Sequence, residues 1–318
     1  MLSSIGFGHW LERHRDHQGK IVTRFKGIVL KLITLGSVAW LTGCQKMEVL
    51  QPKGPVAADE KHLLITAVGL MLIIVVPVII LTLLIAFRYR ASNKKAKYAP
   101  EWTHSVKLEL LWWAVPIVIV SILAMITWKS THALDPYKPL DVPQKPITIQ
   151  VVSLNWRWLF IYPDQHMATL NFVEFPVHTP VNFRITSDAP MNSFQIDQLA
   201  GQIYAMAGMQ TKLHLMADQV GDYNGRSVSF SGPGFNGMEF TARVVTADQF
   251  AQFVQTVQKT NNSLTAAAYN QLIPDSEDTR IVYYSSVDDH LFEDIMMKYM
   301  MPMSGNDPDG APMAISQK

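Results

Sequence analysis

This 318-residue chain can form few thiolate-based structures, because it has a single cysteine, Cys44. One thiol excludes an intrachain disulfide and any metal site built from two or more cysteines. The histidines after it show no short ligand spacing, and methionines at helical spacing pack more often than they bind metal. We therefore expect packing or surface roles for His166, His178, His214, His290, Met296, Met297, Met300, Met301 and Met303.

The lone thiol stands at a position typical of lipid attachment. A basic stretch from Arg24 to Lys31 precedes the twelve uncharged residues 32–43, and Cys44 follows directly to give the sequence Leu41-Thr42-Gly43-Cys44. A basic start, a short apolar run and small residues before the cleavage point indicate an export signal. The last four residues resemble the bacterial lipobox, in which the cysteine sulfur receives a diacylglycerol. We predict a lipoprotein signal peptide over residues 1–43 and lipidation at Cys44.

Two uncharged stretches are long enough to cross a bilayer. Residues 63–87 and 110–128 contain 25 and 19 residues without charge. As helices they would measure about 37 and about 28 Å, against a hydrocarbon core of about 30 Å. Tryptophans near both ends of the second stretch are typical of interfacial anchors. We expect a lipid-anchored transmembrane hairpin over residues 44–134.

The loop between these stretches, residues 88–109, sets the orientation. It has six basic residues against two acidic ones, which predicts a cytoplasmic loop. Both flanking segments then lie outside, as export of Cys44 also requires. We therefore expect a multi-pass protein of the bacterial inner membrane with its soluble part in the periplasm. The balance of 27 basic and 26 acidic residues gives no reason to expect nucleic acid as a partner.

After a proline-containing linker at residues 135–139, short runs rich in β-branched and aromatic residues alternate with turn signals. Such runs predict an antiparallel β-sandwich or barrel. The expected strands are 147–153, 156–162, 169–175, 181–186, 212–216, 227–231 and 238–245. From Thr246 the apolar residues fall on one helical face, and a further helix is expected near residues 291–299. The Gly/Pro/Asp-rich end, residues 304–318, is expected to be disordered.

A two-helix hairpin that leads into an exported sandwich resembles subunit 2 of the heme-copper respiratory oxidases, whose sandwich is a cupredoxin. In members that oxidise cytochrome c, two cysteine thiolates bridge a dinuclear copper centre, because soft sulfur holds copper well. The family pattern is Asp-x-x-His, followed later by Cys-x3-Cys-x3-His-x2-Met. Residues 187–194 and 230–241 resemble these segments but lack the ligands. The ligand positions are occupied by Asn192, Phe230, Gly234, Met238 and Thr241, so we expect no metal in this chain.

A cupredoxin-like sandwich without copper ligands resembles the quinol-oxidising branch of the family, and is most similar to the cytochrome bo-type ubiquinol oxidases. This resemblance rests on an aromatic-rich C-terminal arm from residue 246 and on four shorter segments, residues 86–94, 127–134, 155–158 and 231–235. It implies a terminal oxidase that oxidises ubiquinol, reduces dioxygen to water and translocates protons. Hemes, the active-site copper and quinol would belong to subunit 1. This chain would hold no cofactor, contact subunit 1 and the other subunits, and offer no docking site for cytochrome c.

The resemblance also implies that Glu109, at the start of the second apolar stretch, admits protons to a channel of subunit 1. A helix-start carboxylate stabilised by the helix dipole is the equally weighted alternative. For Trp156 and Trp158, which lie near the electron-entry surface in copper-bearing relatives, core packing or a subunit contact is expected.

The expected organisation is a signal at 1–43, a hairpin at 44–134, a cupredoxin-like domain at 135–245, an arm at 246–303 and a tail at 304–318. Two alternatives remain open. One is subunit 2 of a menaquinol oxidase, because the quinone site would lie in another subunit. The other is a membrane-anchored periplasmic lipoprotein that acts as a receptor or assembly factor.

Overall fold

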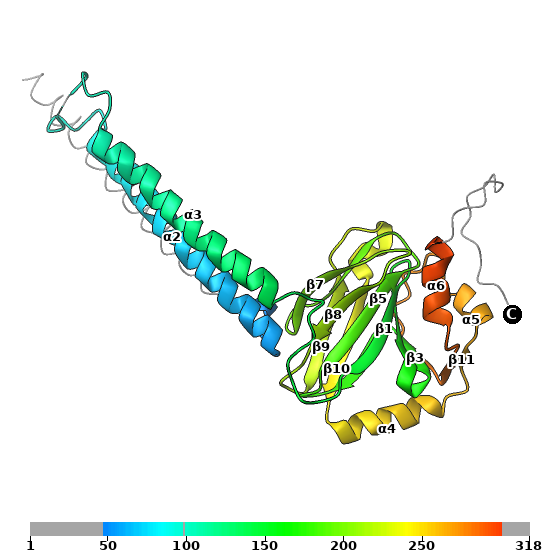
Figure 1. Ribbon diagram of the computed structural model, residues 1–318. Coiled ribbons are helices and arrows are strands. Elements are labelled where there is room, and N and C mark those ends of the chain that lie inside the picture. The colour runs from blue at the N-terminus through cyan, green and yellow to red at the C-terminus, as the bar shows by residue number, and fades with distance from the viewer. Residues whose placement is uncertain (1–46, 98, 301–318) are drawn as a thin grey trace, which may run out of the picture. The chain divides into compact units, whose positions relative to one another are not determined.

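The computed structural model describes residues 47–97 and 99–300. The expected signal peptide, the lipidation site Cys44 and the expected tail at 304–318 lie outside the described residues. Within them, two long apolar helices precede a β-sandwich, and a partly helical arm follows it (Figure 1). The expected fold class, an apolar helical hairpin followed by a β-sandwich with a partly helical C-terminal arm, is confirmed.

The two helices follow a short 3-10 turn, η2 (Glu48–Leu50). Helix α2 (Pro55–Arg88) has 34 residues and α3 (Val106–Ala133) has 28, and the two lie side by side (Figure 1). At about 1.5 Å per residue they measure about 51 and about 42 Å. Each is longer than its uncharged stretch, because a polar turn or two extends it at the ends. Apolar side chains are exposed all round both helices, and both have the length and composition of a membrane span.

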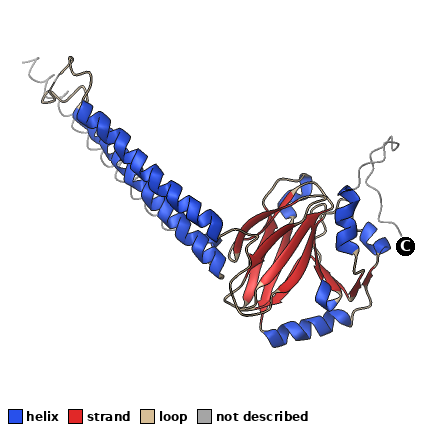
Figure 2. Cartoon of the chain, viewed as in Figure 1, coloured by secondary structure: helices blue, strands red, loops and turns tan. Residues whose placement is uncertain are grey.

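The sandwich consists of two sheets (red in Figure 2). The six-stranded sheet has the order β12-β3-β2-β1-β5-β8 and the five-stranded sheet the order β4-β10-β9-β6-β7. The strands that precede the arm are β1 (Ile147–Ser153), β2 (Trp158–Tyr162), β3 (Met167–Leu170), β4 (Phe172–Pro176), β5 (Val181–Ser187), β6 (Asn192–Ile196), β7 (Ala200–Ala205), β8 (Thr211–Leu215), β9 (Gly221–Ser227) and β10 (Glu239–Val245), with 3-10 turns η3 (Pro163–Gln165) and η4 (Pro233–Gly237) between them.

Aromatic side chains fill the space between the sheets. Trp158 and Phe160 of β2 meet Phe194 of β6 and Phe240 of β10, and all four are at most 3% exposed. The Phe194 and Phe240 rings stack with centroids 5.0 Å apart. Large rings that contact one another in this way make a dense core and a fixed separation between the sheets.

The arm forms a second apolar cluster on the outer face of the six-stranded sheet. Side chains alternate between the two faces of a strand, so Leu159 and Ile161 of β2 point away from the main core. There they pack with Tyr269, Leu291 and Phe292 of the arm. The arm consists of α4 (Ala247–Gln258), β11 (Ser263–Leu264), α5 (Ala266–Asn270), β12 (Val282–Tyr284), β13 (Ser286–Val287) and α6 (Leu291–Met300).

Both expected helices of the arm are present, as α4 and α6. The α4 residues expected on one face include Phe250 and Val257, which are buried in the main core. A capping box starts this helix: the Thr246 hydroxyl accepts from the Gln249 backbone N–H, and the Gln249 side chain accepts from the Thr246 N–H.

Several strand expectations were wrong. The expected strand at 169–175 is two strands, β3 and β4, which lie in different sheets because Asn171 between them adopts a left-handed conformation (φ 57°). The purely antiparallel arrangement is also wrong, because β1 pairs with β5, and β4 with β10, in parallel. The expected strand at 227–231 is mostly loop, and β6, β7 and most of β9 carried too little alternation to be predicted.

Candidate functional site

The two segments that resemble the copper-binding segments of the family come together in the fold. Strands β6 and β9 are neighbours, with Phe194 opposite Ser227, so the loop that enters β6 lies beside the loop that leaves β9. The Ser227 hydroxyl donates to Asn192 Oδ1 at 2.9 Å, and the Val228 N–H donates to the Ser193 carbonyl at 3.1 Å. We call residues 187–194 and 228–238 the loop pair.

Asn192 stands at the expected histidine position and is 1% exposed. Its oxygen accepts from Ser227, and its amide nitrogen donates to the Pro190 carbonyl at 3.1 Å. The amide oxygen therefore links β6 to the end of β9, whereas the amide nitrogen bonds within its own loop. An amide engaged in this way has no nitrogen lone pair to offer a copper ion.

Gly234 stands at the second cysteine position, and an indole occupies the space beside it. A Cβ atom at Gly234 would lie 2.4 Å from Cδ2 of Trp156, and one at Gly232 would lie 3.1 Å from Cζ2 of the same ring. The indole Nε1 donates to the Ser231 carbonyl at 3.1 Å. Glycine at residue 234 thus allows Trp156 to lie directly against the loop backbone. Trp156 fills the loop pair, whereas Trp158 is a fully buried core residue.

The other three positions do not converge on a common point. Phe230 is 78% exposed and contacts Phe235, whereas Met238 is 1% exposed and belongs to the main core. Thr241 lies within β10, opposite Phe172 of β4. A dinuclear copper centre needs two thiolates and a set of ligands directed at one point. The side chains at these positions do not fit such a centre, and among the described residues no group of three or more His, Cys, Asp or Glu could hold a metal ion.

The loop pair also contains a buried charge network. The Asp188 side chain is 0% exposed and accepts from Lys298 Nζ at 2.8 Å and from the Tyr299 hydroxyl at 2.5 Å. Its other oxygen accepts from the Tyr269 hydroxyl at 2.8 Å. Burial, reinforced by the neighbouring carboxylate, raises the pKa of both tyrosines. The three donors come from residues 81 to 111 positions further along the chain, so no local motif could have indicated this contact.

A second buried carboxylate, Glu174, lies in β4 opposite Arg243 of β10. Burial raises the pKa of Glu174 to about 7, although the positive charge of Arg243 acts in the opposite direction. Arg243 offsets only part of the effect of burial on this pKa, because its guanidinium is also bound by Asp222. Both carboxylate oxygens of Asp222 accept from it, at 2.7 and 3.0 Å. Glu174 is therefore a buried group that titrates near neutral pH.

Glu109 lies in the first turn of α3 and is exposed. It follows the basic connection between the helices, which carries Arg88, Arg90 and further lysines. The carboxylate makes no hydrogen bond or ion pair within the part of the chain that the structure describes. It is free to contact solvent or another subunit.

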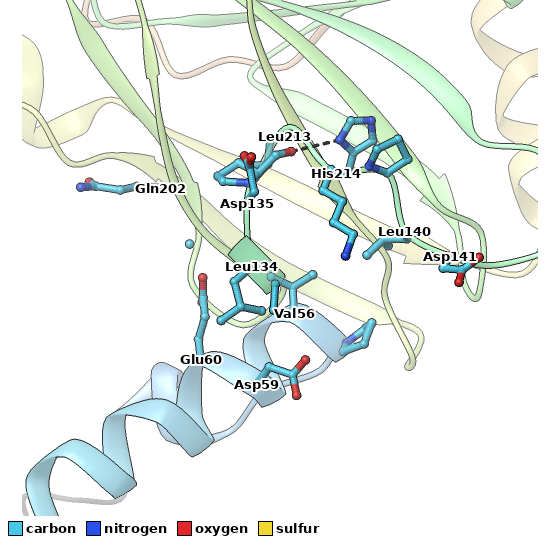
Figure 3. Close-up of a pocket in the computed structure, with 16 residues that line it drawn as sticks. Val56, Asp59, Glu60, Leu134, Asp135, Leu140, Asp141, Gln202, Leu213 and His214 are labelled. Carbon is cyan, nitrogen blue, oxygen red and sulfur yellow. Dashed lines mark hydrogen bonds between the residues drawn. The ribbon is translucent and has the colours of Figure 1, made fainter. Parts of the chain in front are cut away.

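A pocket of about 260 Å³ lies where the start of α2 meets the sandwich (Figure 3). Asp59 and Glu60 of α2 line it with Asp135 and with His214 of β8, whose Nδ1 lies 3.0 Å from the Pro136 carbonyl oxygen. Polar side chains thus surround the first turns of α2, before its uncharged stretch begins at Leu63. This end of the helix is built for an aqueous boundary rather than for lipid.

Comparisons with known proteins place these features in a family. Residues 55–129 match the model of the cytochrome c oxidase subunit II transmembrane domain, and residues 258–303 match the COX aromatic-rich motif. The cytochrome bo(3) ubiquinol oxidase subunit 2 of Pseudomonas aeruginosa is 52% identical over 270 residues, which cover 85% of this chain and 81% of that protein. The ubiquinol oxidase subunit 2 of Acetobacter aceti is 44% identical over 91% of this chain and 94% of its own length.

A more distant relative is the quinol oxidase subunit 2 of Bacillus cereus, which is 39% identical over 76% of this chain and 84% of its own length. Among solved structures, the periplasmic domain of cytochrome oxidase subunit II of Bradyrhizobium japonicum aligns with 36% of this chain and 95% of its own. It does so at 22% identity and a TM-score of 0.35.

Proposed function

Since this chain belongs to the family of cytochrome bo(3) ubiquinol oxidase subunit 2, we propose that it serves a quinol-oxidising complex without carrying electrons itself. It is a membrane-anchored subunit of a multi-subunit heme-copper oxidase. The reaction of the complex is the oxidation of ubiquinol and the reduction of dioxygen to water, coupled to proton translocation. Hemes, the active-site copper and the quinol site belong to subunit 1 in this proposal.

The state of the loop pair is the observation that carries the proposal. Asn192 is engaged at both ends, Trp156 lies against Gly234, and Phe230 faces away from the core. No cysteine follows Cys44 anywhere in the sequence. A thiolate-bridged copper centre has neither its ligands nor its space here, so electrons from quinol must reach the hemes by another route. For the same reason, no docking site for cytochrome c is part of the proposal.

The placement in the membrane is also proposed. The basic loop at 88–109 faces the cytoplasm, and the sandwich, residues 135–245, and the arm, residues 246–303, face the periplasm. Trp112, Trp113 and Trp128 are 62 to 71% exposed near the two ends of α3, where interfacial aromatics anchor a span. Removal of residues 1–43 and lipidation of Cys44 would add a second attachment to the same outer face. This topology belongs to a bacterial inner membrane.

Purification of the tagged full-length chain from its native membrane in mild detergent tests the complex. We expect stoichiometric heme and a large partner subunit to co-purify, and quinol to drive oxygen uptake by the preparation. A heme-free, stable chain would favour the lipoprotein receptor or assembly factor instead. Comparison of ubiquinol with menaquinol as the electron donor separates the two kinds of quinol oxidase.

Glu109 is proposed as the point where protons enter a channel of subunit 1. An exposed carboxylate at the start of a span can collect protons from the cytoplasm and pass them to a less polar interior. Glu109→Ala should slow quinol-driven turnover of the purified complex while the heme content stays unchanged. Glu101→Ala, in the same loop, is the matched control. Equal turnover in the two variants would leave Glu109 as an ordinary helix-start carboxylate.

A further inference from the structure

Met297 and Met300, near the C-terminal end of the described residues, are 44 and 56% exposed. Met191 and Met209 are exposed to a similar extent, at 49 and 54%. Of the nine large hydrophobic residues exposed between residue 147 and residue 300, four are methionines and none is a leucine. The exposed apolar surface of this part of the chain is therefore rich in thioether sulfur, which aliphatic side chains lack.

The fold gathers these methionines from three segments. A Cβ atom at Gly208, in the turn between β7 and β8, would lie 3.1 Å from Cβ of Tyr299 in α6. That contact brings the turn carrying Met209 to the end of α6 that carries Met300. The loop before β6 reaches the same place, because Asp188 binds Lys298 and Tyr299. Met191 follows in this loop and directly precedes Asn192, which pairs with Ala205 between β6 and β7.

Within α6, Met297 and Met300 are three residues apart. Side chains at this spacing lie on the same face of a helix, with Cβ atoms about 5–6 Å apart. Two flexible thioethers from such positions can reach one small ion between them. A third sulfur, from Met209, would come from the neighbouring turn and complete a low-coordinate site.

The local charge permits a cation. Lys298, the basic residue between the two methionines, is 5% exposed and is neutralised by Asp188. Arg184 of β5, near the start of α6, interacts with Glu293 at 3.5 Å. Asp294, one turn before Met297, is exposed and adds negative charge. Hard divalent ions prefer oxygen ligands, whereas neutral thioethers select soft monovalent copper.

We propose that Met297, Met300 and Met209 form a surface site for Cu(I). The site is separate from the loop-pair positions of the family copper centre, and it holds a closed-shell ion that neither accepts nor donates an electron there. Its existence does not depend on the proposed oxidase activity, because the binding test uses this chain alone.

Titration of the purified full-length chain with Ag(I), a redox-inert substitute for Cu(I), tests the proposal, followed by Cu(I) competition against a chelator under ascorbate. We expect one ion per chain. The double variant M297L/M300L should bind at least about tenfold more weakly, a loss of about 1.4 kcal/mol, and M209L should weaken binding to a smaller extent. Leucine conserves the volume and removes only the sulfur.

The matched control is M71L/M125L, which replaces two exposed methionines of α2 and α3 and should leave the affinity unchanged. Thermal unfolding of each variant shows whether the fold is retained, and M209L provides the test if the double variant unfolds. No binding by the unmodified chain, or equal binding by all variants, would overturn the proposal.

Discussion

At the scale of single residues, Asp188 shows how a buried charge can be tolerated. Its carboxylate lies in the loop pair with one ammonium and two hydroxyl groups around it, all from the arm. An isolated carboxylate at this depth would be strongly unfavourable, and only a complete set of donors makes it stable. The network therefore joins the loop that enters β6 to helices α5 and α6.

Asp188→Asn should destabilise the protein far more than the loss of an exposed pair. The substitution leaves the ammonium of Lys298 buried without its counterion, which typically costs about 3–5 kcal/mol. Asp289→Asn breaks the His166–Asp289 pair, whose side chains are 68 and 67% exposed, and should cost about 0–1 kcal/mol. Chemical denaturation of the full-length chain in detergent measures both. Equal losses would mean that the Asp188 network contributes little.

Glu174 makes stability depend on pH. Its pKa rises on folding from 4.5 to about 7, so the folded state binds a proton more tightly than the unfolded state does. The stabilisation from this proton is complete below about pH 4.5 and is lost as pH rises through about 7; its upper limit is about 3 kcal/mol. Glu174→Gln should therefore reduce the pH dependence of the unfolding free energy between pH 5 and 8 and increase stability at pH 8. A variant with the unmodified pH profile would show that Glu174 titrates normally.

At the scale of elements, the arm acts as a third layer on the six-stranded sheet. Strand β2 is buried along all five residues because the main core covers one face and the arm covers the other. A strand covered on both faces is apolar throughout rather than alternating, as the sequence of β2 is. The arm therefore belongs to the folded body of the sandwich.

Phe292→Ala tests the contribution of the arm. The side chain is 1% exposed, and truncation of a buried phenylalanine typically costs about 3–5 kcal/mol. Phe230→Ala removes the same atoms from a side chain that is 78% exposed and should change stability by about 0.5 kcal/mol or less. Limited proteolysis should cut the arm of the first variant only. Similar stability of the two variants would contradict the burial of Phe292.

The elements differ in how far the sequence could predict them. The two long apolar helices and the buried face of α4, with Phe250 and Val257, could be predicted because each follows from a simple pattern of apolar residues along the chain. The break at Asn171 could not, because its side chain accepts from the Trp158 N–H and donates to the Asp278 carbonyl, which lies 107 residues further on. The absence of copper ligands at the family positions could be predicted from residue type alone. The packing of Trp156 against Gly234 could not, because it depends on tertiary contacts.

At the scale of the whole molecule, the chain combines a membrane hairpin with a sandwich for which we propose a structural role without electron transfer. The residues that would direct electrons through the loop pair instead hydrogen-bond or pack within it. We therefore propose that electrons enter the complex through another subunit, from a quinol that diffuses in the membrane.

Oxygen uptake by the purified complex with two different donors tests this claim most directly. Ubiquinol should support rapid uptake, and reduced cytochrome c at the same electron concentration should support none above the background without enzyme. Comparable turnover with cytochrome c would contradict the claim, because in the proposed complex those electrons would have to enter through the sandwich of this chain.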